Sequence, residues 1–164
     1  MINGNWRWSL DLEIEILSEL KGCSGIVHVC SGASGIGDYR IDRFWDPSNS
    51  WKVETHGKQK KNSGIPNIRA DMCMLPVRSG TAGAVVCDPP YSYLRFSKYF
   101  RSLVDEVARI TAPGGKVLFV FPSIFYHPTL TLERFWCRPA GDKFVPTYKI
   151  LSVSTKKNFQ LTDY

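Results

Sequence analysis

An acid, two prolines and a tyrosine stand together in the middle of the chain, at Asp88-Pro89-Pro90-Tyr91. The prolines fix the local backbone and remove two amide donors, so carbonyl oxygens are left to face a ligand. Asp88 can accept one N–H of an amino group while a proline carbonyl accepts another, and the Tyr91 ring offers a base a surface for stacking. These residue types predict a pocket that holds an amino group with its lone pair exposed. A rigid turn beside a core tyrosine would explain the prolines but not the flanking acid.

Glycine-rich or acidic residues also follow three earlier runs of β-type sequence. The run GIVHVC ends at the small residues 31–37, where the backbone can approach a ligand closely. Asp42 follows the second run, and a carboxylate there can accept hydrogen bonds from both hydroxyls of a ribose. Asp71 ends the third run, where it can accept from the exocyclic amine of an adenine. Alone, the glycine-rich segment is as well explained by an ordinary turn, and an exposed turn is the better explanation of each aspartate. Together at one sheet edge they fit a nucleoside.

The elements that must position these residues alternate between β-type and helical patterns. Apolar spacing predicts an N-terminal helix over about 9–21 and a second helix over 95–111. The run KVLFVF at 116–121 is the clearest strand, and segments of about 132–138 and 144–156 predict a hairpin that closes the sheet. The pattern predicts an α/β fold with a mainly parallel, doubly wound sheet and a C-terminal antiparallel hairpin.

Size and composition narrow the classes of protein. The 164 residues fit a single minimal domain over 1–164, and no apolar run approaches the roughly 20 residues that span a bilayer. Acids at Asp11, Glu13 and Glu15 interrupt any signal-peptide pattern, so we expect a soluble cytoplasmic protein without a membrane partner. Five cysteines without a Cys-x-x-Cys pair predict buried thiols and no metal site. The net charge of +6 suits a polyanionic partner without demanding one.

The segments from about Val27 to Phe121 resemble class I S-adenosylmethionine-dependent methyltransferases, in particular the amino-methyltransferases with an Asp-Pro-Pro-Tyr motif. Residues 70–76 are similar to the family's Asp-then-Leu-Pro stretch, and 112–115 to the Pro-Gly-Gly before its fifth strand. The resemblance implies a Rossmann-like methyltransferase fold and S-adenosylmethionine as the cofactor. It also implies methyl transfer to an exocyclic amino group of a nucleic-acid base, with adenine N6 or cytosine N4 as the expected target.

The same resemblance assigns roles to residues of this sequence. It implies that Asp88 to Tyr91 hold the target amine, that Asp42 binds ribose, and that Asp71 with Met72 binds adenine. The cofactor-binding residues that it implies are Cys30, Ser31, Gly32, Ala33, Gly35, Gly37, Asp42, Asp71 and Met72. Asp38 is a second candidate for the ribose. Two departures from the family are the short connection before Asp42, which lacks the usual helix, and His28-Val29-Cys30 where the family commonly has an acid at the end of the first strand.

Substrate selection needs more than this short chain offers, because there is no room for a separate target-recognition domain. A specificity partner, a homodimer or the shape of a DNA or RNA substrate would have to supply it. Two basic groups are candidates for contact with a phosphate backbone, although a solvated surface is their default interpretation. The candidates are Arg95, Lys98 and Arg101 at helical spacing, and Lys58, Lys60 and Lys61 in one polar segment.

Other functions remain open at this stage. An RNA guanine-N2 methyltransferase would use the same motif, and a protein or a small-molecule amine is a further possible substrate. A non-catalytic methyltransferase-fold subunit that binds RNA or a partner protein is the alternative from a different class. A nicotinamide dehydrogenase is disfavoured, because no helix follows the glycine-rich segment and that class gives no reason for Asp-Pro-Pro-Tyr.

Overall fold

The computed structural model describes residues 8–32, 34–43, 54–55, 58–59, 66–90, 98–140 and 147–158. Five residues with a predicted role lie outside these ranges. They are Ala33, Lys60, Lys61, Tyr91 and Arg95.

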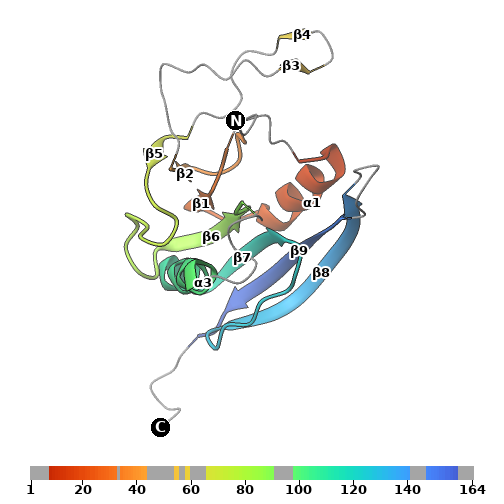
Figure 1. Ribbon diagram of the computed structural model, residues 1–164. Coiled ribbons are helices and arrows are strands. Elements are labelled where there is room, and N and C mark those ends of the chain that lie inside the picture. The colour runs from red at the N-terminus through yellow and green to blue at the C-terminus, as the bar shows by residue number, and fades with distance from the viewer. Residues whose placement is uncertain are drawn as a thin grey trace.

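A seven-stranded sheet forms the centre of the molecule, with the strand order β5-β2-β1-β6-β7-β9-β8 (Figure 1). Its strands are β1 (Ile26–Val29), β2 (Tyr39–Asp42), β5 (Ile68–Arg69), β6 (Ala82–Cys87), β7 (Thr111–Phe121), β8 (Leu130–Ala140) and β9 (Thr147–Lys156). The first five strands of this order pair in parallel, and β9 is antiparallel to both β7 and β8. The predicted mainly parallel sheet with a C-terminal antiparallel hairpin is therefore confirmed. A separate antiparallel pair joins β3 (Glu54–Thr55) to β4 (Lys58–Gln59).

Chain order reverses between β1 and β6, because β2 and β5 extend the sheet on one side and β6 and β7 on the other. Ligands of open α/β sheets bind beyond the carboxyl ends of the strands at such a switch point. A ligand site is therefore expected beside the residues that follow β1 and β6.

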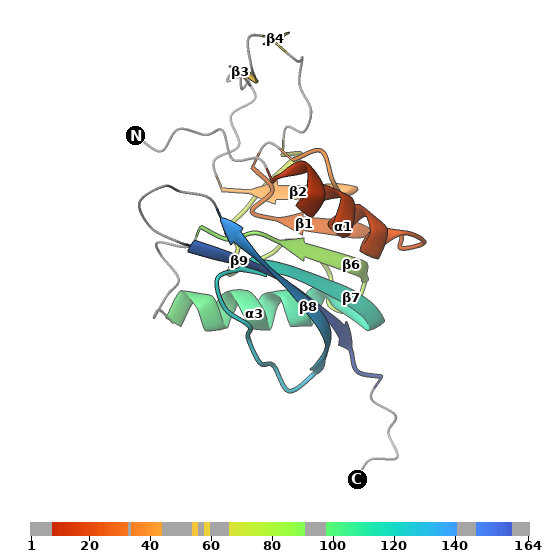
Figure 2. The same cartoon turned by 90° about the vertical axis from the view of Figure 1, so that its right-hand side faces the viewer.

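The two helices α1 (Leu10–Leu20) and α3 (Lys98–Ile110) lie on opposite faces of the sheet (Figure 2). Successive side chains of a strand point to opposite faces of the sheet, so each helix packs against its own set of strand residues. On the α1 face the buried cluster includes Leu12, Ile16, Leu20, Ala84, Val86, Leu118 and Val120. On the α3 face it includes Leu103, Val107, Ile110, Val85, Cys87, Val117 and Phe119. Within the described residues, neither helix has the length and apolar character needed to cross a bilayer.

Strand β7 begins earlier than the sequence predicts. The helix ends at Ile110 and the strand starts at Thr111, so that Pro113-Gly114-Gly115 lies inside β7 and not in a turn before it. The register against β6 shifts between Ala82 and Ala84, which marks an irregularity at this point. Pro113 and Gly114 are exposed there, so the missing proline N–H faces no buried partner.

An ion pair on α3 fastens the segment that follows β5. Arg109 Nε donates to Glu106 Oε1 at 2.6 Å, and Glu106 Oε2 accepts from the backbone N–H of Leu75 at 2.8 Å. The Arg109 guanidinium also donates to the carbonyl oxygens of Leu75 and Val77. The hydrogen bond from Arg109 is the main cause that lowers the pKa of Glu106. This clamp fixes the segment that carries Asp71.

The connection from β1 to β2 is short, as the sequence predicts. It runs from Cys30 to Asp38, and its described residues contain no helix. Parallel neighbours usually need a crossover of a dozen or more residues, most often through a helix. Here the described residues of the connection form a loop.

The cysteines differ in exposure, which gives a test of the packing. Burial raises the pKa of the Cys87 thiol well above its usual range, whereas Cys137 is exposed, so the prediction that the thiols are buried is wrong for Cys137. Because the thiolate is the nucleophile, we expect iodoacetamide at pH 8 to alkylate Cys137 at least about tenfold faster than Cys87. Peptide mass spectrometry of timed samples measures both rates. Equal rates in the folded chain would contradict the packing, and equal rates in urea are the control.

Candidate functional site

The carboxyl ends of β1, β2 and β6 meet through three hydrogen bonds, two between backbone atoms and one from a backbone N–H to a side chain. The N–H of Ser31 donates to the carbonyl of Ile41 at 3.1 Å, and the N–H of Asp88 donates to the carbonyl of Val29 at 3.3 Å. The N–H of Gly32 donates to Asp42 Oδ2 at 3.0 Å. The start of the glycine-rich segment therefore lies between two of the predicted acids, one from β2 and one from β6.

Cys30 makes the turn that leaves β1. Its φ of 57° lies in the left-handed region, which favours glycine, so the chain bends sharply at a residue that carries a side chain. The thiol Sγ lies 3.7 Å from Met72 Sδ, which joins the end of β1 to the segment after β5. Burial is the main cause that raises the pKa of Cys30, and Asp42, Asp88 and Asp71 add to it through their negative charge. The predicted carboxylates thus gather around this turn.

Asp71 begins the tight turn that follows β5. Its Oδ1 accepts from the N–H of Cys73 at 2.9 Å, and the residue forms an isolated bridge with Met74. Asp71 is exposed and Met72 is half-buried. The Asp71 side chain is therefore accessible to solvent, while the Met72 side chain contacts Cys30.

The Asp88 carboxylate has a partner that the sequence does not predict. Asp88 is half-buried, and its Oδ2 accepts from the indole Nε1–H of Trp8 at 2.6 Å. Pro89 is buried and Pro90 is exposed. One signal was available, because Ala84 and Val86 face α1 and Asp88 continues that alternation. An aromatic residue ahead of a predicted helix does not by itself indicate that contact.

His28 is fully buried on the same face. Its Nδ1 lies 3.1 Å from the carbonyl oxygen of Ile36, and its ring stacks on Trp8 with 5.1 Å between ring centroids. Burial lowers the pKa of His28 to about 4, so the ring is neutral at pH 7. A carbonyl oxygen can only accept, so we infer that Nδ1 carries the hydrogen and Nε2 is an acceptor.

Two buried polar atoms near the glycine-rich segment lack a hydrogen-bond partner among the described residues. They are His28 Nε2 and Ser31 Oγ. Buried polar atoms are paired in most folded proteins, so these two exceptions call for a specific explanation. No group of three or more possible metal ligands occurs in the described ranges.

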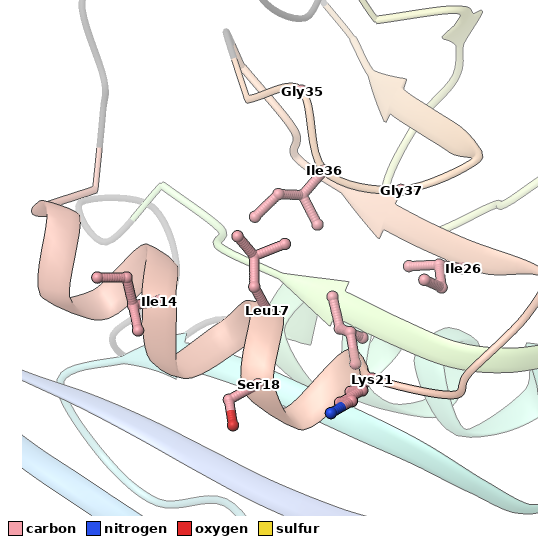
Figure 3. A pocket seen from close by; sticks show the side chains of 9 residues that line it. Ile14, Leu17, Ser18, Lys21, Ile26, Gly35, Ile36 and Gly37 are labelled. Carbon is pink, nitrogen blue, oxygen red and sulfur yellow. The ribbon is translucent and has the colours of Figure 1, made fainter.

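Other predicted residues lie elsewhere. Gly35 and Gly37 line a hollow of about 600 Å³ between α1 and the loop before β2, where Leu17 and Ile36 point toward one another (Figure 3). Asp38 Oδ2 accepts from the N–H of Ile26 at 2.8 Å, which places Asp38 at the amino end of β1. The structure therefore separates these three residues from the edge that carries Cys30, Asp42 and Asp88.

The described basic candidates lie on α3 and on β4, and not on the strands that end at this edge. Lys98 and Arg101 are exposed at the start of α3, and Lys98 Nζ lies 5.8 Å from the ring centre of Tyr99. Lys58 belongs to β4, in the separate two-stranded sheet.

Comparison with known proteins identifies the fold. The N-methyltransferase NodS from Bradyrhizobium japonicum, in complex with S-adenosyl-L-homocysteine, matches with a TM-score of 0.63 at 13% identity, over 90% of this chain and 87% of NodS. A candidate methyltransferase from Bacillus halodurans matches with a TM-score of 0.59 at 13% identity, over 90% of this chain and 100% of its own. TrmN from Thermus thermophilus matches at 0.59 and 16% identity, over 94% of this chain and 51% of TrmN, so this chain spans about half of TrmN.

No protein-family model and no curated protein sequence matches the chain. The likeness therefore rests on structure, and it agrees with the strand order and the antiparallel position of β9. The chain has the Rossmann-like fold of the methyltransferases.

Proposed function

We propose that the chain is an S-adenosylmethionine-dependent methyltransferase that modifies an exocyclic amino group of a nucleic-acid base, adenine N6 or cytosine N4. The observation that carries this proposal is the position of Asp88. It follows β6 at the switch point of a methyltransferase fold, and its N–H contacts the end of β1 directly. The target amine would thus be held beside the loop that receives the cofactor.

The residues after β1 and β2 fit the proposed cofactor. Ser31 Oγ and His28 Nε2 are buried polar atoms that a ligand with amino, carboxylate and hydroxyl groups, directly or through water, can satisfy. Asp42, fixed to the loop through Gly32, would accept from the ribose, and Asp71 with Met72 would bind the adenine. When bound, S-adenosylmethionine supplies a methyl group on a positively charged sulfur.

Asp88 and the prolines would orient the amine. A carboxylate oxygen accepts one N–H, a proline carbonyl accepts a second, and the nitrogen lone pair is then directed at the methyl group. The new nitrogen–carbon bond would replace the carbon–sulfur bond, the neutral thioether would leave, and the surplus amine proton would pass to water or to Asp88. Neither Pro89 nor Pro90 has an N–H that could compete for Asp88. Most of the rate would come from holding the reactants in attack geometry. A paired base would first have to be extruded, at a cost of a few kcal/mol.

The direct test uses S-adenosylmethionine with a labelled methyl group, incubated separately with DNA, RNA and protein. Label in DNA or RNA, followed by nucleoside analysis that finds N6-methyladenine or N4-methylcytosine, is the expected result. Guanine-N2 methylation of RNA would keep the reaction type but correct the base. Label in protein alone, or cofactor binding without any transfer, would contradict the proposal.

The role of Asp42 can be tested by binding alone. In Asp42→Asn one oxygen remains to accept from the Gly32 N–H, but a single amide oxygen serves two ribose hydroxyls poorly. We expect S-adenosylmethionine to bind about tenfold more weakly in isothermal titration calorimetry. The matched control is Asp38→Asn, because Asp38 lies at the other end of β1. An equal loss in the control, or none in Asp42→Asn, would remove Asp42 from the cofactor site.

A further inference from the structure

The contact between Trp8 and Asp88 joins residues 80 positions apart in the chain. The donor and acceptor are 2.6 Å apart, in the range of a strong hydrogen bond to a charged group. Asp88 points to the α1 face by the alternation of β6, and Trp8 comes to that face from the segment just before α1. The fold therefore brings both residues, Trp8 and Asp88, to the same face of the sheet.

The indole ring of Trp8 is held in place by its contact with His28. Its ring stacks on His28 with an angle of 20° between the planes, and the His28 ring is fixed by the contact of Nδ1 with Ile36. His28 is fully buried, and Trp8 packs against the apolar cluster on the α1 face. The Trp8 N–H is thus presented to Asp88 by a rigid stack of two rings.

We propose that Trp8 is a positioning residue for the methyl transfer, whose indole N–H holds the Asp88 carboxylate in the orientation that receives the amine. This inference rests on the proposed function. A carboxylate on a short side chain turns easily, and an error of about 1 Å at the reacting centre costs on the order of a hundredfold in rate. The indole suits the task because it donates only, and its proton is not lost at neutral pH.

The test compares Trp8→Phe with Trp136→Phe in the full chain. Phenylalanine at position 8 keeps an aromatic face for His28 but removes the N–H, whereas Trp136 stands on β8 beside Arg134. Initial rates at saturating S-adenosylmethionine are measured over a range of concentrations of the nucleic acid that the unaltered chain labels. We expect Trp8→Phe to lower kcat about tenfold, with KM for the nucleic acid and Kd for the cofactor nearly unchanged. Trp136→Phe should retain the original kcat.

A nuclear magnetic resonance measurement keeps the contact testable without activity. In the ¹⁵N-labelled chain, the indole N–H signal that disappears in Trp8→Phe belongs to Trp8. We expect this signal to move upfield in Asp88→Ala, where the charged acceptor is gone, and to stay in place in Asp105→Ala. A signal that does not respond to Asp88→Ala would overturn the inference.

The kinetic outcomes separate this inference from the proposed function. An unchanged kcat in Trp8→Phe, with transfer intact, would overturn the positioning role alone. A raised kcat would overturn it as well, because Trp8 would then be blocking the place of the amine. Absence of transfer in the unaltered chain would remove the proposed function, and the positioning role with it.

Discussion

Replacing Asp88 by alanine should reduce the rate of methyl transfer by about a hundredfold to a thousandfold. This is the range seen when one preorganised polar group is removed from an active site. The reason is that the amine loses its charged acceptor, while the Trp8 N–H loses its partner. Cofactor affinity should change little, because the residues proposed to bind the cofactor come from other segments: Ser31 and Gly32 lie in the loop after β1, and Asp42 lies at the end of β2. Transfer of labelled methyl groups and calorimetry measure the two quantities.

Asp105→Ala is the matched control for this change. Asp105 lies on the exposed side of α3, where its Oδ1 stands 3.4 Å from His127 Nε2, and it has no proposed role. Its removal should leave both transfer and binding intact. If Asp88→Ala lowered cofactor affinity as strongly as it lowered transfer, Asp88 would belong to the cofactor site, and the assignment of the amine to it would be wrong.

Replacing Gly83 by alanine should be among the most destabilising single changes in the sheet. A Cβ at this position would lie 2.2 Å from the carbonyl oxygen of Ser24, a backbone atom that cannot turn aside as a side chain can. Gly83 belongs to β6, and the next four residues of that strand are fully buried. We expect the free energy of unfolding to fall by about 3 kcal/mol or more in urea titrations at 25 °C.

Gly22→Ala separates crowding from backbone strain. Gly22 has a φ of 82°, but a Cβ there would meet no atom within 4 Å. This change should cost only about 1 kcal/mol, the usual penalty for a side chain in the left-handed region. A loss for Gly83→Ala no larger than that of the control would mean that β6 and the turn at Ser24 are packed less closely than described.

The sequence was sufficient to predict the layers of the fold. The helical spacing of apolar residues at 9–21 matches α1, and the run 116–121 lies within β7. The hairpin was predicted because two β-rich segments follow each other with a short break. These signals are local, and each depends on residues that are close in the chain. The exact start of β7 was not predicted, because Pro113-Gly114-Gly115 is usually a turn.

The candidate site was only partly accessible from the sequence. Asp42 and Asp88 were selected because each follows a strand, and Cys30 and Met72 because the family resemblance implied them. The structure places all four at one edge. The sequence could not show that Gly35 and Gly37 lie away from these four residues, since a glycine-rich segment does not indicate where the chain changes direction. Trp8 was missed because its partner is remote in sequence and its position depends on the packing of α1.

The place of β9 has a consequence for the synthesis of the chain. Because β9 lies between β7 and β8 but is the last of the three to be made, β8 leaves the ribosome before it has a neighbour to pair with. Its exposed Leu132 and Phe135, and the open edge of β7, would meanwhile be available to other nascent chains. A stop codon before Thr147 would therefore remove β9 with the residues that follow it, leave an unpaired edge on β7 and take from β8 the strand it pairs with, a larger defect than the loss of one strand suggests.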